Sequence, residues 1–438
     1  MKTIPNCYCT EDSHLFAQYW IGLIMLKPQQ TFLPKLRIGM FVDFLKDHSN
    51  RFFRRVGLVT AKKTWSKPPK RDVLIYDRFR SAAVQSYFCP SITEILDERG
   101  EKLNMYILFR ALLTHGKLSV DLYIDEYIKA VSPKVIITHY EQNSRFYLLK
   151  NRHPHIKFVA IQSDLRAATT FPFVISQKYL IEKAKCDALF AFNEVLGSYY
   201  KKVIQGPVIS AGSLRANMFS SSKKAVEYDL CFISQFRDPK KNFEVPLLGR
   251  RIPYNIFFRK AESIILNFLE KYSAIKNLRF AVVGCSQDWK REEDYYRDIL
   301  KNEFYFEKKI SQFSSYEFLS KANVIVSIDS TLGGESLAIG HKTAIFAIRH
   351  FFIKEESYKF GWPAKMPDKG PFWTNEPNED HFREILDYLF DVDDDEWDKT
   401  RIFHLKDVIE YDYGNSKFVD LMKSFGVKTK TPVLFDDK

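Results

Sequence analysis

Short apolar runs alternate with amphipathic segments along most of this chain. Between residues 72 and 210, runs rich in branched and aromatic side chains predict strands at 72–76, 104–108, 135–138, 157–161, 188–192 and 208–210. The segments between them predict helices at 91–99, 122–130, 144–150 and 194–203. Strands and helices in alternation are typical of a parallel α/β domain.

The same alternation begins again after the polar segment SSSKK at 220–224. Strands are predicted at 228–233, 279–283, 305–309 and 322–328, and helices near 261–272, 293–301 and 315–321. We therefore expect two tandem Rossmann-like domains, at 71–222 and 223–390, with a ligand in the cleft between them, beyond the carboxyl ends of the strands.

The two flanking regions differ from this pattern. Residues 1–70 are predicted to form a partly helical, basic extension, in which 36–45 have helical spacing. That segment is either an ordinary packing helix or an amphipathic helix that touches an anionic membrane. Residues 391–438 are expected to form a solvated turn and closing helices. The aspartates at 391–395 lack the glycine and final glutamate of a calcium loop, so calcium binding is rejected.

The stretch VIVSIDSTLGGESLAIGHKTAI at 324–345 combines a strand, a turn, a helix start and a second strand. Ser330 and Thr331 favour a helix N-cap, so a plain capped helix is one interpretation. Gly333 and its neighbour would let a ligand approach the backbone. The preferred interpretation is therefore a nucleotide site, in which free helix N–H groups bind phosphate and Glu335 accepts hydrogen bonds from ribose hydroxyls.

Composition limits the partners. The chain has 438 residues, 45% of them hydrophobic and 27% charged, and a formal net charge of +12. This charge suits nucleic acid, an anionic membrane surface or phosphorylated substrates. Nucleic acid is the weakest of these, because the sequence has no basic arm, zinc-ligand spacing or RNA-binding aromatic signature. Scattered cysteines and the lack of a signal or membrane-spanning segment predict a cytoplasmic protein, located at the inner face of the membrane if the extension binds lipid.

The run SSYEFLSKANVIVSIDSTLGGESLAIGHKTAIFAIR, followed by GPFW at 370–373, resembles the bacterial surface-carbohydrate glycosyltransferases of GT-B architecture that include the retaining β-Kdo transferases. This resemblance implies a nucleotide-sugar donor, CMP-Kdo or a related CMP-activated acidic sugar, no cofactor and no metal. It also implies a saccharide or lipid-linked saccharide acceptor, in lipopolysaccharide or capsule synthesis. Another donor (a UDP- or GDP-sugar, or a CDP-polyol) and a non-catalytic nucleotide-sugar-binding protein are the alternatives.

The donor of this reaction is anionic, so basic side chains should converge on it. The candidates follow predicted strands: Arg237, Arg349, Lys308, Lys309 and Arg166. Trp373 is either a stacking platform for a ring of the donor or a core aromatic.

Glycosyl transfer also needs a carboxylate, as a base or as a nucleophile. Glu141, Asp164, Asp238 and Asp77 follow predicted strands. Glu141 is favoured as acceptor base or sugar contact, and Asp238 is favoured over Asp164 as the nucleophile of a retaining double displacement. His139 is either a partner of that base or a structural histidine.

Overall fold

The computed structural model describes residues 61–99, 101–165, 183–220, 225–240, 244–247 and 250–432. These residues form two compact units. Unit 1 contains the described residues up to 78 together with 94–133, and unit 2 contains 79–93 and the described residues from 134 onward. The helix expected at 36–45, with its possible membrane contact, and the candidate Arg166 lie outside the described residues. The predicted domain boundaries stay a prediction.

Unit 1 corrects two predicted elements. The expected strand at 104–108 is wrong: helix α4 (Met105–His115) occupies it, capped by Asn104, whose Oδ1 accepts from the Ile107 N–H at 3.1 Å, and ended by Gly116 at φ 64°. The expected helix at 91–99 is also wrong, because the β-branched residues of this segment form a short 3₁₀ turn and strand β3. Besides α4, unit 1 contains β1 (Lys62–Thr64), β2 (Val73–Tyr76), β4 (Lys102–Asn104), α5 (Val120–Val131) and β3 (Thr93–Leu96) from its second residue onward. The 3₁₀ turn η1 (Pro90–Ile92), which leads into β3, belongs to unit 2.

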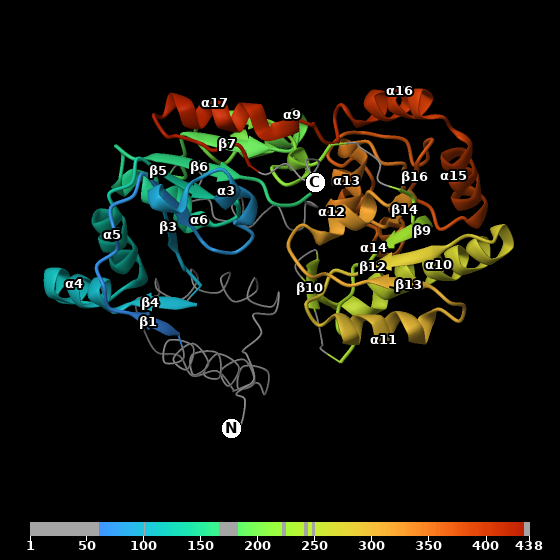
Figure 1. Ribbon diagram of the computed structural model, residues 1–438, viewed down its shortest axis with the longest axis horizontal. Helices are drawn as coiled ribbons and strands as arrows, with labels where there is room; N and C mark the ends of the chain where they lie inside the picture. Colours follow the sequence, from blue (N-terminus) through green and yellow to red (C-terminus); the bar gives the residue numbers. More distant parts are fainter. Residues whose placement is uncertain are drawn as a thin grey trace, which may run out of the picture. The chain divides into compact units, whose positions relative to one another are not determined.

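Unit 2 contains two lobes, each built on a parallel sheet (Figure 1). In the first lobe the strands pair in the order β5-β6-β7-β8, and each confirms a predicted strand. The bounds are β5 (Val135–Thr138), β6 (Lys157–Ile161), β7 (Ala188–Ala191) and β8 (Val208–Ser210), with α3 (Ala82–Ser86), α6 (Ser144–Arg152), α9 (Glu194–Lys201) and η2 (Ala216–Met218).

The second lobe has six parallel strands in the order β13-β12-β9-β14-β15-β16. Numbered by their place in the chain, these strands lie in the order 3-2-1-4-5-6 of a Rossmann sheet, so the strand order reverses between β9 and β14. The strands are β9 (Tyr228–Ile233), β12 (Phe280–Val283), β13 (Tyr305–Glu307), β14 (Ala322–Ser327), β15 (Thr343–Phe346) and β16 (Trp373–Thr374). A separate antiparallel hairpin consists of β10 (Glu244–Leu247) and β11 (Arg250–Pro253).

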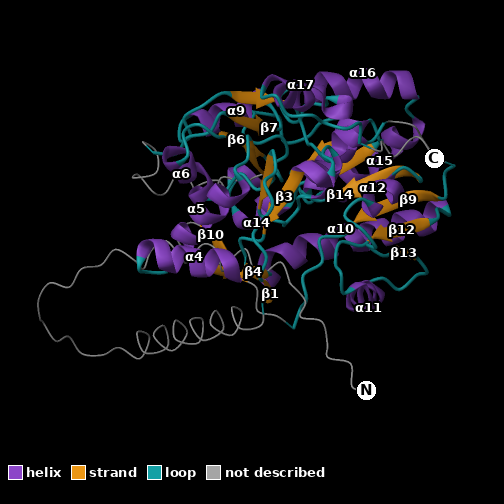
Figure 2. Ribbon diagram, turned by 60° about the vertical axis from the view of Figure 1, so that its left-hand side comes forward, coloured by secondary structure: helices purple, strands orange, loops and turns teal. Residues whose placement is uncertain are grey.

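Helices accompany the second sheet, as Figure 2 shows. They are α10 (Tyr254–Lys276), α11 (Trp289–Ile299), α12 (Ser314–Leu319), α13 (Thr331–Ile339), α14 (Arg349–Ile353), η3 (Glu356–Tyr358) and α15 (Glu379–Asp391). The strands β12 and β15 are buried along their whole length, which explains their continuous apolar runs. One core cluster joins Cys231 and Ile233 of β9 to Val283 of β12 and Ile325 of β14.

The last described elements are α16 (Asp394–Leu405), η4 (Tyr413–Asn415) and α17 (Ser416–Ser424), in the region where closing helices are expected. Asp393 caps α16, since its Oδ1 accepts from the Glu396 N–H at 2.8 Å. The aspartate cluster therefore begins a helix. Phe418 of α17 packs edge-on against Tyr87 and Phe190, so this helix returns to the first lobe. No helix among the described residues is long and apolar enough to cross a membrane.

Candidate active site

The N-terminus of α13 lies beside the loop that follows β6 of the first lobe. Ser330 is the N-cap, as predicted, and its Oγ accepts from the Leu332 N–H at 3.3 Å. The Thr331 Oγ1 accepts from the Leu165 N–H at 3.0 Å. This hydrogen bond joins the two lobes at the helix end where the sequence predicts a phosphate.

The two glycines of this helix have a packing function. A Cβ atom on Gly333 would lie 2.5 Å from the Cβ and Oγ of Ser327, and one on Gly334 would lie 2.7 Å from a methyl carbon of Leu165. Because glycine has no Cβ atom, α13 can lie directly against β14 and against the loop after β6 of the first lobe. The approach of a ligand to this backbone stays a prediction.

Glu335 is buried, with 1% of its surface exposed, and binds side chains from both lobes. Its Oε1 accepts from the Ser213 hydroxyl and, at 3.2 Å, from Arg215 Nη2, while its Oε2 accepts from the Tyr316 hydroxyl at 2.7 Å. Burial, followed by the charge of Glu335, raises the pKa of Tyr316 well above its ordinary value. Glu335 thus fixes the loop after β8 to α12 and α13, and its predicted contact with a ribose stays a prediction.

Glu141 holds together the elements around the carboxyl ends of β5 and β6. The carboxylate is fully buried, its Oε2 accepts from the N–H and hydroxyl of Ser163 at 3.0 and 3.3 Å, and its Oε1 accepts from the Tyr200 hydroxyl at 3.2 Å. The carboxylate that the sequence predicts as the acceptor base therefore already accepts three hydrogen bonds from the protein. In this structure Glu141 positions Ser163, and a direct catalytic role is untested.

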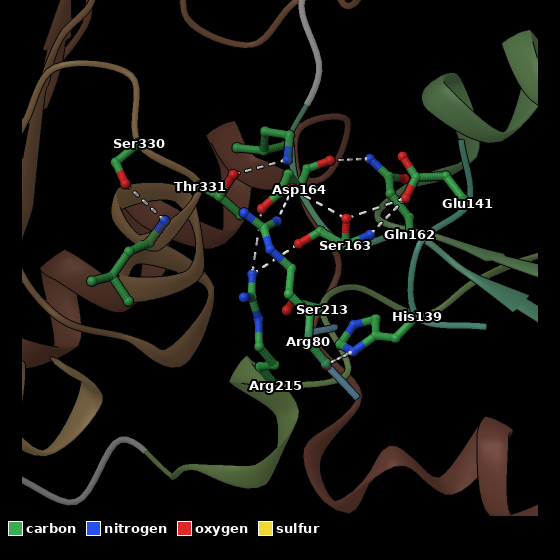
Figure 3. A network of polar contacts seen from close by, with 12 residues as sticks. Arg80, His139, Glu141, Gln162, Ser163, Asp164, Ser213, Arg215, Ser330 and Thr331 are labelled. Carbon is green, nitrogen blue, oxygen red and sulfur yellow. Dashed lines mark hydrogen bonds and ion pairs between the residues drawn. The ribbon is translucent and has the colours of Figure 1, made fainter. Parts of the chain in front are cut away.

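Asp164 lies next to Ser163 and forms ion pairs with two arginines, Arg80 and Arg215, as Figure 3 shows. Arg80 donates to its Oδ2, Arg215 Nη2 lies 3.7 Å from its Oδ1, and the Ser163 hydroxyl donates to Oδ2 at 3.1 Å. Arg215 also donates to the Ser163 carbonyl at 2.8 Å. The structure thus brings together two predicted carboxylates, Glu141 and Asp164, through one serine.

Neither arginine was among the predicted residues. Arg80 lies in a turn with φ 57°, a left-handed conformation that is uncommon outside glycine, and Arg215 lies five residues beyond β8. Extending the strand-end criterion to the longer loop after β8 could have found Arg215. The same extension would also have found Arg80, which lies four residues beyond β2, although its unusual turn could not be predicted.

His139 follows β5 and has 1% of its surface exposed. Its Nδ1 lies 2.8 Å from the Arg80 carbonyl oxygen, and because a carbonyl only accepts, Nδ1 carries the proton. The Nε2 is then an acceptor, and it is buried without a hydrogen-bond partner among the described residues. Burial, followed by the charge of Arg215, lowers the pKa of His139 from 6.5 to about 3, so the ring is neutral at neutral pH. Figure 3 shows this ring beside Arg80.

A second polar group lies where the strand order of the second sheet reverses. Asp329 follows β14, and its Oδ1 accepts from Gln235 Nε2 at 2.9 Å and from Arg349 Nη1 at 2.5 Å. Its Oδ2 is buried and lacks a hydrogen-bond partner within the described chain. Arg349, a predicted donor contact, is itself buried and lies over the Phe258 ring. Ligands of open α/β sheets bind at such a reversal, beyond the carboxyl ends of the strands.

The other predicted donor contacts lie at strand ends of the same sheet. Arg237 is half-buried and donates to the Phe236 carbonyl at 3.1 Å, and Lys308 is exposed, with its Nζ 4.9 Å from the centre of the Trp289 ring. Trp373 is fully buried and donates to the Pro367 carbonyl at 3.0 Å, which confirms its interpretation as a core aromatic.

Asp238 has a structural partner in the second lobe. Its Oδ2 accepts from Arg291 Nη1 at 2.6 Å, and its Oδ1 accepts from the Lys240 N–H at 2.9 Å, as in a turn stabilised by an aspartate. The role of Asp238 as nucleophile stays a prediction. Asp77, the weaker candidate, is buried in unit 1 and pairs with Arg99 at 2.7 Å.

Comparison with known proteins gives a family and a fold. Residues 159–425 match the family described as "putative O-antigen biosynthesis protein". A "putative UDP-N-acetylglucosamine 2-epimerase" from Listeria monocytogenes is structurally similar, with a TM-score of 0.51 and 13% identity over 83% of this chain and 98% of that one. Comparison with curated proteins found no match.

Two further structures are similar at lower scores. The S. aureus MnaA–UDP structure has a TM-score of 0.46 and 12% identity, over 82% of this chain and 97% of that one. The wall teichoic acid polymerase TagF has a TM-score of 0.47 and 9% identity, over 90% and 99%. At such identities a structural similarity describes the fold alone. The two Rossmann-like lobes constitute the predicted GT-B fold, as found in glycosyltransferases.

Proposed function

This chain belongs to the O-antigen biosynthesis family matched by residues 159–425, and we propose that it is a glycosyltransferase that transfers a sugar from a nucleotide donor to a saccharide acceptor. The observation that carries the proposal is the polar network at the junction of the lobes. There the N-terminus of α13 contacts the loop after β6, and a buried neutral histidine with an unpartnered Nε2 lies beside two arginines.

On the donor side, the nucleotide phosphate would lie at the N-terminus of α13, near Ser330 and Thr331. The helix dipole favours an anion there, and Arg237 and Arg349 follow β9 and β15, the two strands that flank β14 in the sheet. The Oδ2 of Asp329 is a buried acceptor that suits a ribose hydroxyl or a base N–H group. These features support a nucleotide sugar without naming its base or sugar. The resemblance of the sequence makes a CMP-activated acidic sugar the first donor to test.

On the acceptor side, His139 would take the proton. The anomeric carbon–phosphate oxygen bond breaks, the acceptor oxygen bonds to that carbon, and the acceptor proton passes to His139 Nε2. Arg80 and Arg215 would hold the anionic donor while Asp164 orients them. The neutral state of the ring supports this role, because an imidazolium has no lone pair to accept a proton.

The stereochemistry is a separate part of the proposal. Retention by double displacement adds a first step, in which a carboxylate attacks the anomeric carbon, releases the nucleotide phosphate and forms a glycosyl ester. The acceptor oxygen then displaces that carboxylate while His139 takes its proton. Asp238 is the first choice for this carboxylate from the sequence, followed by Asp164. Intact-protein mass spectrometry with donor alone should reveal one added sugar that is lost in Asp238→Ala. An inverted product with no adduct in any variant would refute double displacement.

Calorimetry with CMP, CDP, UDP and GDP tests the proposed function. One nucleotide should bind at least about tenfold more tightly than the others, and Asp329→Asn should weaken it. The sugar conjugate of that nucleotide should then be consumed only with a saccharide acceptor present. Binding of no nucleotide by the full chain would contradict the donor assignment, and binding without turnover of any sugar conjugate would favour a nucleotide-sugar-binding protein.

A further inference from the structure

Helix α4 of unit 1 and two residues outside it, Trp65 and Leu118, expose large apolar side chains. We call them the α4 patch: Trp65, Tyr106, Phe109, Leu112, Leu113 and Leu118. Leu113 is 86% exposed and Phe109 is 48% exposed. Trp65, itself 66% exposed, stacks on Phe109 with ring centres 6.3 Å apart. A single exposed leucine is ordinary, but a contiguous apolar surface of this kind usually marks a site of interaction.

The arrangement follows from the helix itself. Ile107 and Ala111 form its buried face, whereas Tyr106, Phe109 and Leu113 recur at intervals of three and four residues on another face. The helix therefore has apolar side chains on both faces. One set packs into unit 1, and the other set is available to a partner.

Lysines are in excess around the α4 patch, although Arg110 of α4 pairs with Glu126 of α5 at 2.7 Å and the exposed Asp121 lies three residues beyond Leu118. The segments 61–70 and 102–118, which carry all six residues of the patch, contain six lysines, one arginine and no aspartate or glutamate. Lys62 and Lys102 are paired across the neighbouring strands β1 and β4, and both are exposed, as are Lys67 and Lys117. Like charges opposite each other on adjacent strands are unfavourable, and an anionic partner would remove that cost.

We propose that the α4 patch docks on an anionic lipid bilayer. A projecting row of leucine and aromatic side chains bordered by lysines matches the boundary between acyl chains and acidic headgroups. Tryptophan and tyrosine favour that boundary because one edge of each ring is polar. This inference goes beyond the proposed function and does not depend on it.

Vesicle sedimentation of the full chain tests the proposal. The protein should bind vesicles containing about 30 mol % phosphatidylglycerol in phosphatidylcholine, and about 0.5 M salt should weaken this binding. Phe109→Ser with Leu113→Ser should lower the partition coefficient at least about tenfold. The matched control is Ile402→Ser with Phe403→Ser, which removes two residues of α16 that are 62% and 67% exposed, and it should stay within about twofold of the natural protein. If the α4 and α16 double variants lower the partition coefficient equally, the assignment of the lipid contact to α4 is wrong.

Carbene footprinting separates the bilayer from other occupants of the patch. The peptide with Leu113 should be labelled in the absence of vesicles and protected when anionic vesicles are added. Protection without vesicles would mean that residues 1–60 or a second copy of the chain already cover the patch, and would overturn the proposal. Unchanged binding to pure phosphatidylcholine vesicles would overturn the role of the lysines.

Discussion

The neutral, buried state of His139 predicts a measurable dependence of stability on pH. In the folded chain the pKa of His139 is lowered from 6.5 to about 3 by burial and then by Arg215. Between these values the unfolded chain binds a proton that the folded chain does not, so stability falls as pH falls, by about 1.4 kcal/mol per pH unit. At pH 5, the free energy of unfolding should therefore be about 2 kcal/mol lower than at pH 7 through this residue alone.

The substitution His139→Gln removes this titration and keeps a side chain that can donate to the Arg80 carbonyl. Urea unfolding of both proteins at pH 7 and pH 5 gives the change in the free energy of unfolding for each. Contributions from groups that titrate far from residue 139 cancel when the two changes are subtracted. The natural protein should lose about 2 kcal/mol more than the variant on going to pH 5. His155→Gln, at an exposed histidine of the same lobe, controls for the loss of a histidine as such. If the natural protein and His139→Gln lose the same free energy of unfolding between pH 7 and pH 5, the conclusion that the His139 ring is neutral in the folded chain is wrong.

The same variant tests the role of His139 in transfer. Loss of a general base lowers kcat by about 10²–10⁴-fold, whereas nucleotide affinity should change little if the nucleotide binds in the second lobe. Imidazole added to His139→Ala should restore part of the rate, with a pH dependence that follows free imidazole. A parallel loss of nucleotide binding and turnover would instead assign His139 a structural function.

Three further predictions concern the junction and the reaction. Glu335→Gln leaves the half-buried Arg215 with only the more distant carboxylate of Asp164, 3.7 Å away, and should lower the free energy of unfolding by about 3 kcal/mol, whereas weakened nucleotide binding at unchanged stability would favour the ribose contact. Gly333→Ala should lower the Tm more than Gly334→Ala, because overpacking against Ser327 costs about 1–3 kcal/mol while a flexible Leu165 end can move; equal shifts would contradict the packing argument. Transfer should persist in EDTA if basic side chains neutralise the leaving phosphate, and a loss that magnesium restores would refute metal independence.

The sequence predicted most strands of the two sheets, and the clearest are those buried along their whole length, such as β5, β7, β12 and β15. Runs such as FAVV in β12 need no knowledge of tertiary contacts to be identified. The two wrong elements have local explanations. The segment 104–108 looks like a strand because it is apolar, but Asn104 caps the helix that follows, and the leucines continue to Leu113. The segment 91–99 has the charges of a helix surface, but Thr93 and Ile95 extend as β3.

The site was predictable only where it depends on strand ends. Glu141 and Asp164 follow β5 and β6, and parallel strands bring their carboxyl ends to one edge, so the sequence could place them together. The partners of Glu335 could not be predicted. Ser213 and Tyr316 belong to different lobes, and only the docking of α13 on the first lobe brings them to one carboxylate. The hydrogen bond that Glu141 Oε1 accepts from the Tyr200 hydroxyl likewise could not be predicted, because it depends on the packing of α9.

The polar atoms without partners at the junction form a complementary pair. His139 Nε2 can only accept, Arg215 Nε can only donate, and both are buried without a hydrogen-bond partner among the described residues. Leaving each unsatisfied costs about 1–3 kcal/mol, which a ligand could recover. An anion can satisfy Arg215 but not His139, whereas a hydroxyl can donate to His139. An anion at Arg215 would also oppose the charge that lowers the pKa of His139, and so would make the ring a stronger base. Donor binding would therefore prepare His139 to receive the proton of the acceptor, which favours an order in which the donor binds first.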